Sequence, residues 1–158
     1  MFLERVYDLA YIALKPLKGI LKPNSWAEKA MIVLEKYGKG VTFNCQMCGQ
    51  CVLHSTGMIC PMNCPKNLRN GPCGGVRPNG HCEVKPEMRC IWVRAYEGAQ
   101  KSEKYGSELM WLLPPINRSL QDSSSWVNML HDIDTSMKVK WAEPEKQEEL
   151  MSVWGKNE

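Results

Sequence analysis

The sequence lacks any uninterrupted run of about 20 apolar residues, so it predicts no membrane-spanning helix. With 158 residues it is also too short for a (β/α)₈ barrel, which needs about 250 residues, and for a two-domain Rossmann enzyme. Cysteine is absent before residue 45 and after residue 90. All eight cysteines therefore lie in one short segment, and the sequence indicates that the specific function resides there.

The N-terminal segment does not read as a secretion signal. Its longest apolar run, residues 9–14, is shorter than a signal-peptide core, and no A-x-A-like cleavage site follows it. We therefore expect a cytoplasmic protein, in which thiols stay reduced and clustered cysteines bind metal rather than form disulfides.

The net charge does not indicate nucleic-acid binding. The formal value is +3 at pH 7, counted with neutral thiols. If all eight cysteines bind as thiolates to two centres of charge +2, the net charge falls to −1. Because the basic balance disappears when the cysteines ligate metal, we expect no nucleic-acid partner.

Apolar residues recur every three or four positions over residues 2–17, which predicts an amphipathic helix that ends or kinks at Pro16. The nearby Lys15, Lys18 and Lys22 would suit a helix on a membrane surface. The polar face also carries acidic residues, so we favour a helix that packs in the core or docks on a partner.

A second helix is marked at both ends. Ser25 and Glu28 form a capping box, and Gly38 is a natural residue just beyond a helix C-terminus. Residues 41–43 then read as a short extended segment. The predicted buried face consists of Ala27, Ala30, Met31, Leu34 and Tyr37.

The cysteine-rich segment shows no periodicity and contains six glycines and five prolines, so we expect metal cross-links rather than apolar burial to hold it. Further helices are predicted over 91–99 and 103–113, through Leu130 from a cap at Ser125 or Asp122, and from Pro144 to Val153. The fold class is mainly α with an irregular, metal-stapled cysteine-rich core and little β. The predicted organisation is 1–40 as N-terminal helices, 41–95 as the metal-cluster domain and 96–158 as a helical or extended partner-docking tail.

Tryptophans are frequent in the cysteine-free tail, which looks too thin to bury them all. Exposed aromatic side chains would indicate a protein interface, whereas buried ones would simply pack on their own domain, and the sequence leaves both readings open. The residues concerned are Trp111, Trp126, Trp141 and Trp154.

The cysteine spacing is the strongest functional signal. A triplet with the spacing C-x₂-C-x₂-C is followed by two Cys-Pro pairs and three more widely spaced cysteines. Bacterial ferredoxins hold [4Fe–4S] clusters with a similar triplet, and their proline-followed cysteine ligates the other cluster. The predicted metal ligands are Cys45, Cys48, Cys51, Cys60, Cys64, Cys73, Cys82 and Cys90.

Eight thiolates match two [4Fe–4S] clusters, our first interpretation, and they also match one [4Fe–4S] cluster with one zinc ion, or two zinc ions. The triplet should share one centre, whose fourth ligand stays open between Cys60, Cys64 and a later cysteine. His54 and His81 are candidate substitute ligands, although we favour solvated loop histidines.

Cations and glycines are interleaved with these cysteines. Basic residues would offset the cluster charge and raise its potential, or simply form a solvated surface. Glycines would let the backbone approach the cluster closely. The residues in question are Lys66, Arg69, Arg77, Arg89, Gly49, Gly57, Gly71, Gly74 and Gly75.

Residues 64–76 (CPKNLRNGPCGGV), 79–84 (NGHCEV) and 90–92 (CIW) resemble the cysteine-rich domain associated with methylenetetrahydrofolate reductases, fused to the reductase or beside it as a small subunit. The resemblance extends over roughly residues 25–130, including Pro114-Pro115-Ile116-Asn117 and Ser124-Ser125-Trp126.

The resemblance implies an accessory subunit in one-carbon metabolism. An FMN-bearing barrel subunit would reduce methylenetetrahydrofolate, and the small subunit would connect that flavin to an electron-donor protein through iron–sulfur centres, with zinc as an alternative. This chain has no recognisable flavin motif and no acid/base pair, so we expect a non-catalytic, electron-transferring subunit. The alternatives are a structural zinc scaffold without a redox role and a nucleic-acid-binding zinc module, which no basic helix supports.

Overall fold

The structure is a computed structural model that describes residues 2–110, 113 and 115–133. It is about 48% helical with almost no strand, which confirms the mainly α fold class. Within the described residues, no helix combines the length and the apolar character needed to cross a membrane. The helix predicted from Pro144 to Val153 lies outside the described residues.

The first two predicted helices form. α1 (Phe2–Leu14) passes into the 3₁₀ helix η1 (Lys15–Gly19) where Pro16 enters the chain. α2 (Trp26–Phe43) begins with the predicted capping box, in which the Glu28 N–H donates to Ser25 Oγ over 3.2 Å. The Glu28 carboxylate reaches back to accept from the Asn24 N–H at 2.6 Å, so the helix start is held from both sides.

The end and the buried face of α2 differ from the prediction. The helix continues through Gly38 to Phe43, so residues 41–43 are not extended, because the left-handed Asn44 (φ 50°) terminates it instead. Leu34 and Tyr37 are 67% and 72% exposed. The inward face carries the buried carboxylates of Glu28 and Glu35, which sequence periodicity alone assigns to solvent.

The 3₁₀ helix η2 (Pro61–Asn63) lies between Cys60 and Cys64. A hairpin-like segment follows and leads to α3 (Ile91–Ala99), which has the predicted bounds. Of the helix predicted over 103–113, the described residues show only the 3₁₀ turn η3 (Gly106–Met110), which is followed by η4 (Arg118–Leu120). α4 (Ser125–Leu130) is capped by Ser124, whose hydroxyl accepts from the Val127 N–H, rather than by either predicted residue.

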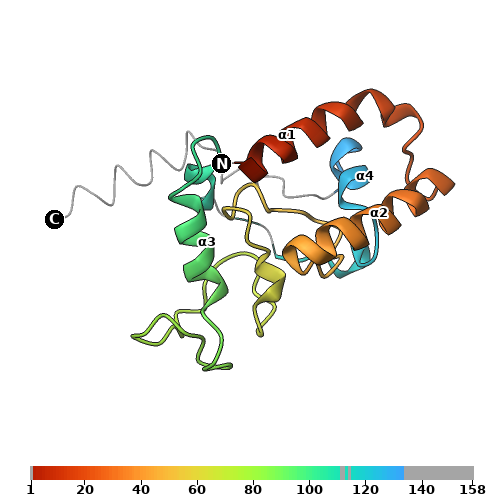
Figure 1. Ribbon diagram of the computed structural model, residues 1–158. Helices are drawn as coiled ribbons and strands as arrows, with labels where there is room; N and C mark the ends of the chain where they lie inside the picture. The colour runs from red at the N-terminus through yellow and green to blue at the C-terminus, as the bar shows by residue number, and fades with distance from the viewer. Residues whose placement is uncertain (1, 111–112, 114, 134–158) are drawn as a thin grey trace, which may run out of the picture.

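α1, α2 and α4 lie together, and α3 stands on the other side of the cysteine-rich segment (Figure 1). A small core joins the helical side and consists of Leu21, Ala27, Val127 and Leu130, with Leu14 and Met31 packed against it. A second buried set lies within the cysteine-rich segment itself, at Met47, Val52, Leu53, Met58 and Met62. The expectation that this segment buries little apolar surface is therefore wrong for residues 45–62.

Trp126 packs on its own domain. It is 7% exposed, its ring lies 4.9 Å from that of Tyr7, and the Lys39 ammonium lies 4.8 Å from its centroid. Trp126 is therefore a residue that packs on its own domain and not an exposed aromatic residue at a protein interface. Trp111, Trp141 and Trp154 lie outside the described residues.

Candidate metal centre

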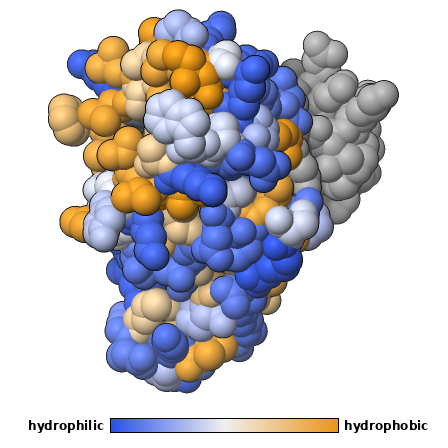
Figure 2. Space-filling model, turned by 90° about the vertical axis from the view of Figure 1, so that its right-hand side faces the viewer, coloured by the Kyte–Doolittle hydropathy of each residue, from blue (hydrophilic) through white to orange (hydrophobic). Residues whose placement is uncertain are grey.

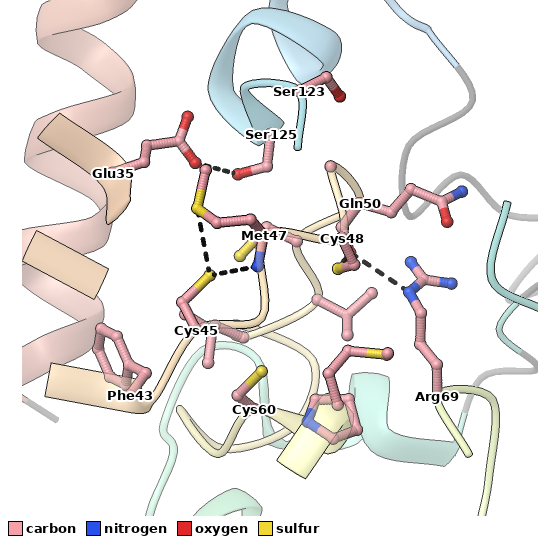
Figure 3. Close-up of a pocket in the computed structure, with 16 residues that line it drawn as sticks. Glu35, Phe43, Cys45, Met47, Cys48, Gln50, Cys60, Arg69, Ser123 and Ser125 are labelled. Carbon is pink, nitrogen blue, oxygen red and sulfur yellow. Dashed lines mark hydrogen bonds between the residues drawn. The ribbon is translucent and has the colours of Figure 1, made fainter. Parts of the chain in front are cut away.

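Four of the eight cysteines line one pocket, namely Cys45, Cys48, Cys51 and Cys60. Figure 3 shows the sulfur atoms of Cys45, Cys48 and Cys60 around the same space, with α2 beside it and α4 above it. The structure thus joins the predicted triplet to the first of the two Cys-Pro cysteines. Cys64 does not line this pocket.

The triplet is shaped by two left-handed residues. Cys45 follows the C-terminus of α2, and the chain then turns at Met47 (φ 49°) and Gly49 (φ 72°). The Met47 N–H donates to Cys45 Sγ over 3.4 Å, a contact of the kind that holds cluster sulfurs. A Cβ on Gly49 would lie 2.3 Å from the carbonyl oxygen of Leu120, so this glycine admits the returning chain rather than the cluster.

Cys60 is brought back by a compact buried loop over residues 52–59. The Thr56 hydroxyl, completely buried, lies 2.9 Å from the Val52 carbonyl oxygen and 2.7 Å from that of Ile59. Gly57 (φ 58°) packs against α3, where an added Cβ would meet the Ala99 nitrogen at 2.3 Å. Loop closure and helix packing together fix Cys60 opposite the triplet.

The pocket disfavours bare thiolates. Its other walls are mainly apolar and include Phe43, Val52, Leu53 and Met62. Burial raises the pKa values of the Cys45 and Cys48 thiols. For Cys60, burial together with the charges of the other three cysteines raises the pKa to about 12. A bound metal cation reverses this preference, because it stabilises the thiolate form of each ligand.

Two cations flank the pocket, one buried and one half-buried. Arg69 is 1% exposed and lines it, and its Nε donates to the Gln50 carbonyl oxygen over 3.3 Å (Figure 3). On the other side, Lys39 Nζ donates to Glu35 at 2.8 Å and to Ser125 Oγ at 2.7 Å. Each positive charge opposes the effect of burial on the pKa of a nearby thiol, Lys39 at Cys45 and Arg69 at Cys48.

Sequence reasoning found Arg69 but missed Lys39 and Glu35. Their i, i+4 spacing on a helix is the usual pattern of a solvated surface pair, so it gave no sign of burial. The other three cations that the sequence singled out behave as a surface: Arg77 and Arg89 are exposed, and Lys66 forms an exposed ion pair with Glu83.

The remaining four cysteines are arranged differently. Cys73 and Cys90 line a second pocket beside Trp92, whereas Cys64 and Cys82 are buried and do not line it. Cys82 pairs with Val76 in an isolated antiparallel bridge. The Cys90 N–H donates to the Gly80 carbonyl oxygen at 3.0 Å, so Cys90 enters α3 from a short hairpin.

All eight cysteines lie in described residues, and none is in a disulfide. Among the described side chains, no group of three or more His, Cys, Asp and Glu converges closely enough to hold one metal ion. His54 is not a solvated loop residue: its ring stacks on Tyr7 and its Nε2 lies 3.2 Å from Glu108. His81 Nδ1 lies 2.7 Å from the Pro86 carbonyl oxygen. Neither histidine lines the pocket of the four cysteines.

Residues 25–119 match the family model described as Methylene-tetrahydrofolate reductase C terminal. The matched region begins at the capping residue of α2 and contains all eight cysteines and α3. No curated protein and no solved structure gives a significant match. α1, η1 and α4 lie outside the matched residues.

Proposed function

The chain belongs to the methylenetetrahydrofolate reductase C-terminal family, and from this premise we propose that it is the iron–sulfur, electron-transferring subunit of a flavin-dependent methylenetetrahydrofolate reductase. In this role it relays electrons between a donor protein and the FMN of a partner barrel subunit. The chain itself is non-catalytic, because the hydride transfer to the folate takes place on the partner.

The observation that carries this proposal is the single pocket lined by Cys45, Cys48, Cys51 and Cys60. Four thiols from one tight triplet and one loop supply the complete ligand set of a [4Fe–4S] cluster. The apolar walls exclude water, and the half-buried Lys39 and the buried Arg69 offset the negative charge of the thiolates. The donor set and its surroundings therefore fit the cluster.

Bound there, the cluster supplies one-electron transfer, and the chain's own residues set its properties. The four thiolates hold it, and the Met47 N–H directed at Cys45 Sγ stabilises the charge on that sulfur. Positive charge and N–H donors near cluster sulfurs raise a reduction potential, while burial lowers it. Lys39 and Arg69 therefore act as tuning residues on two sides of the same centre.

The other four cysteines, Cys64, Cys73, Cys82 and Cys90, are assigned to a second metal centre. This division places the two Cys-Pro cysteines in different centres, as in the ferredoxin pattern. The spacing within the second set is long, and its hairpin holds Cys82 and Cys90 near α3. We propose a second [4Fe–4S] cluster here, and zinc is the alternative that metal analysis separates from it.

The test is anaerobic iron, sulfide and zinc analysis of the chain purified with its reductase, together with low-temperature EPR of the dithionite-reduced protein. Two clusters give about eight irons per chain, whereas one cluster and one zinc ion give about four irons and one zinc. A preparation with zinc but no iron would refute the redox role and establish the structural scaffold instead.

Substitutions then test the division of ligands. We expect Cys60→Ser and Cys48→Ser each to remove the centre of the triplet while leaving the other centre in place. Cys73→Ser is the matched comparison and should remove only the second centre. If Cys60→Ser retained both EPR signals and full iron content while Cys64→Ser lost the triplet's signal, the assignment of Cys60 would be wrong.

A further inference from the structure

The outward faces of α1 and α2 are apolar although both helices carry charge. On α1, Glu4 is buried and bonds Ser102, and Asp8 pairs with Lys104, so the acidic side chains face the protein. Leu9 and Ile12 point outward and are 65% and 64% exposed. This is the reverse of the pattern of a helix whose outer face meets water.

α2 repeats the inversion. Its carboxylates Glu28 and Glu35 are buried, whereas its outer side carries exposed Trp26, Val33, Leu34, Tyr37 and Val41. The apolar side chains gather at the upper left of the face shown in Figure 2, at the level of α1 and α2, and the lower part is mostly hydrophilic. Exposed apolar surface on this scale marks an interaction site rather than a solvated face.

The charges around this surface have one sign. Between residues 2 and 43, each acidic side chain is buried or half-buried, and each exposed charged side chain is basic. The exposed cations are Arg5, Lys15, Lys18, Lys22, Lys29 and Lys36. A partner that covers the apolar face while carrying carboxylates at its rim would therefore be complementary in charge.

Between the two helices runs an apolar groove that leads to the cysteines. Leu3, Val6 and Ala10 of α1 and Leu34 of α2 line it, and its volume is about 510 Å³. Its walls are mainly apolar and run along two helices, which suits apolar side chains or a helix of another protein. A concave groove also suits a protein ridge better than a flat bilayer.

The groove and the pocket of the four cysteines share walls. Glu35, Phe43 and Leu53 line both. A protein seated in the groove would thus contact side chains that also form walls of the cysteine pocket. Electron exchange needs such proximity, and the groove offers it on the same side as the proposed cluster.

We propose that the outer surface of α1 and α2, with the groove between them, is the docking surface for the flavin-bearing reductase subunit, which presents an apolar ridge rimmed by carboxylates. This inference rests on the proposed function and deepens it by placing the interface. Trp126 does not contribute to such a surface, since its side chain is buried in the chain's own fold, and the docking role of the tail over residues 96–158 stays a prediction.

The test measures binding of the full-length chain to the purified reductase subunit by calorimetry, under anaerobic conditions. Ile12→Glu and Tyr37→Glu should each weaken binding at least tenfold. Tyr96→Glu is the matched control, because Tyr96 is also an exposed tyrosine on a helix, at 55%, but on α3. It should change the affinity less than twofold, and all three variants should keep wild-type iron content.

A measurement on the wild-type chain guards against misfolded variants. In the complex, Lys15, Lys18, Lys29 and Lys36 should be protected from acylation, while the exposed Lys85 and Lys101 should stay reactive. Equal reactivity of all six in a formed complex would overturn the docking surface and leave the proposed function intact. So would wild-type affinity in both Ile12→Glu and Tyr37→Glu.

Other occupants of the groove give different results. Binding of the free chain to phosphatidylglycerol vesicles that competes with the reductase, or self-association that Tyr37→Glu abolishes without affecting the reductase, would overturn the inference. Absence of iron from the wild-type chain would refute the electron-transfer function whether or not the docking variants lose affinity. The two proposals therefore fail separately.

Discussion

Lys39→Met is expected to be the most informative single substitution, because it removes one partner of a buried ion pair beside the cysteine pocket. The side chains of Lys39 and Glu35 are 12% and 3% exposed and lie 2.8 Å apart. Glu35 also accepts from the hydroxyls of Ser124 and Ser125 at 2.5 and 2.7 Å, and from the Trp126 N–H at 3.1 Å. The network thereby connects α2 to α4.

Loss of the ammonium leaves the Glu35 carboxylate buried without its cation. Breaking a buried pair in this way costs about 3–5 kcal/mol. That is a large part of the roughly 5–15 kcal/mol by which a domain of this kind is stable. Urea unfolding of the metal-loaded chain, performed anaerobically, measures the loss. Lys36→Met on the exposed side of the same helix is the control and should stay within about 0.5 kcal/mol of wild type.

The pH dependence of this loss identifies its cause. In the wild type, burial favours a raised pKa for Glu35, but the charge and hydrogen bond of Lys39 and the two serine hydroxyls together hold the pKa below its usual value. This contribution to stability is present above the normal carboxyl pKa and is lost as pH falls. Without Lys39, burial raises the pKa of Glu35, so protonation becomes favourable in the folded state. The difference in free energy of unfolding between the wild type and Lys39→Met should therefore become smaller as the pH falls from about 7 to about 5.

A second substitution completes the cycle. Glu35→Gln combined with Lys39→Met removes both charges while keeping an amide oxygen as acceptor for Ser124 and Trp126. The double variant should be more stable than Lys39→Met alone, because no uncompensated charge remains buried. A loss below about 1 kcal/mol for Lys39→Met that does not change with pH would refute the argument that this pair is energetically buried.

Three further outcomes are expected. Gly57→Ala should lower the free energy of unfolding by about 2–4 kcal/mol and weaken iron binding, because its added Cβ would clash with α3. Gly80 also has a positive φ but open space at its Cβ, so Gly80→Ala should lower the free energy of unfolding by only about 1–2 kcal/mol. Equal losses in thermal unfolding would show that the clash with α3 is not the cause. Burial raises the pKa of Cys60, so the free energy of unfolding of the metal-free chain should fall as the pH rises from about 9 to about 12. The fall should be smaller in Cys60→Ala when unfolding is followed by circular dichroism. Burial lowers the pKa of His54 from 6.5 to about 4, so stability from its neutral form should disappear as pH falls through that window, and an unchanged acid profile in His54→Phe would contradict this.

The sequence determined those features whose causes are local. The capping box at Ser25, the break at Pro16 and the bounds of α3 all follow from neighbouring residues, and the structure has each of them. The C-x₂-C-x₂-C spacing likewise places three thiols close together in the chain, and all three line one pocket. The family assignment rested on equally local motifs around Cys73 and Cys82, and the family match confirms it.

Tertiary structure decided what depends on residues far apart in sequence. Cys60 rather than Cys64 lines the triplet's pocket because loop 52–59 closes on itself and packs on α3. The buried face of α2 was predicted only in part: Ala27 and Met31 pack inward, whereas Leu34 and Tyr37 are exposed. Periodicity records where apolar residues recur but not which side of the helix another segment covers. Here Ser124, Ser125 and Trp126 hydrogen-bond to Glu35 and draw a carboxylate inward. The apolar side of α2 is left facing outward. Which residues partner a buried charge depends on contacts between distant parts of the chain, and no local sequence pattern contains those contacts.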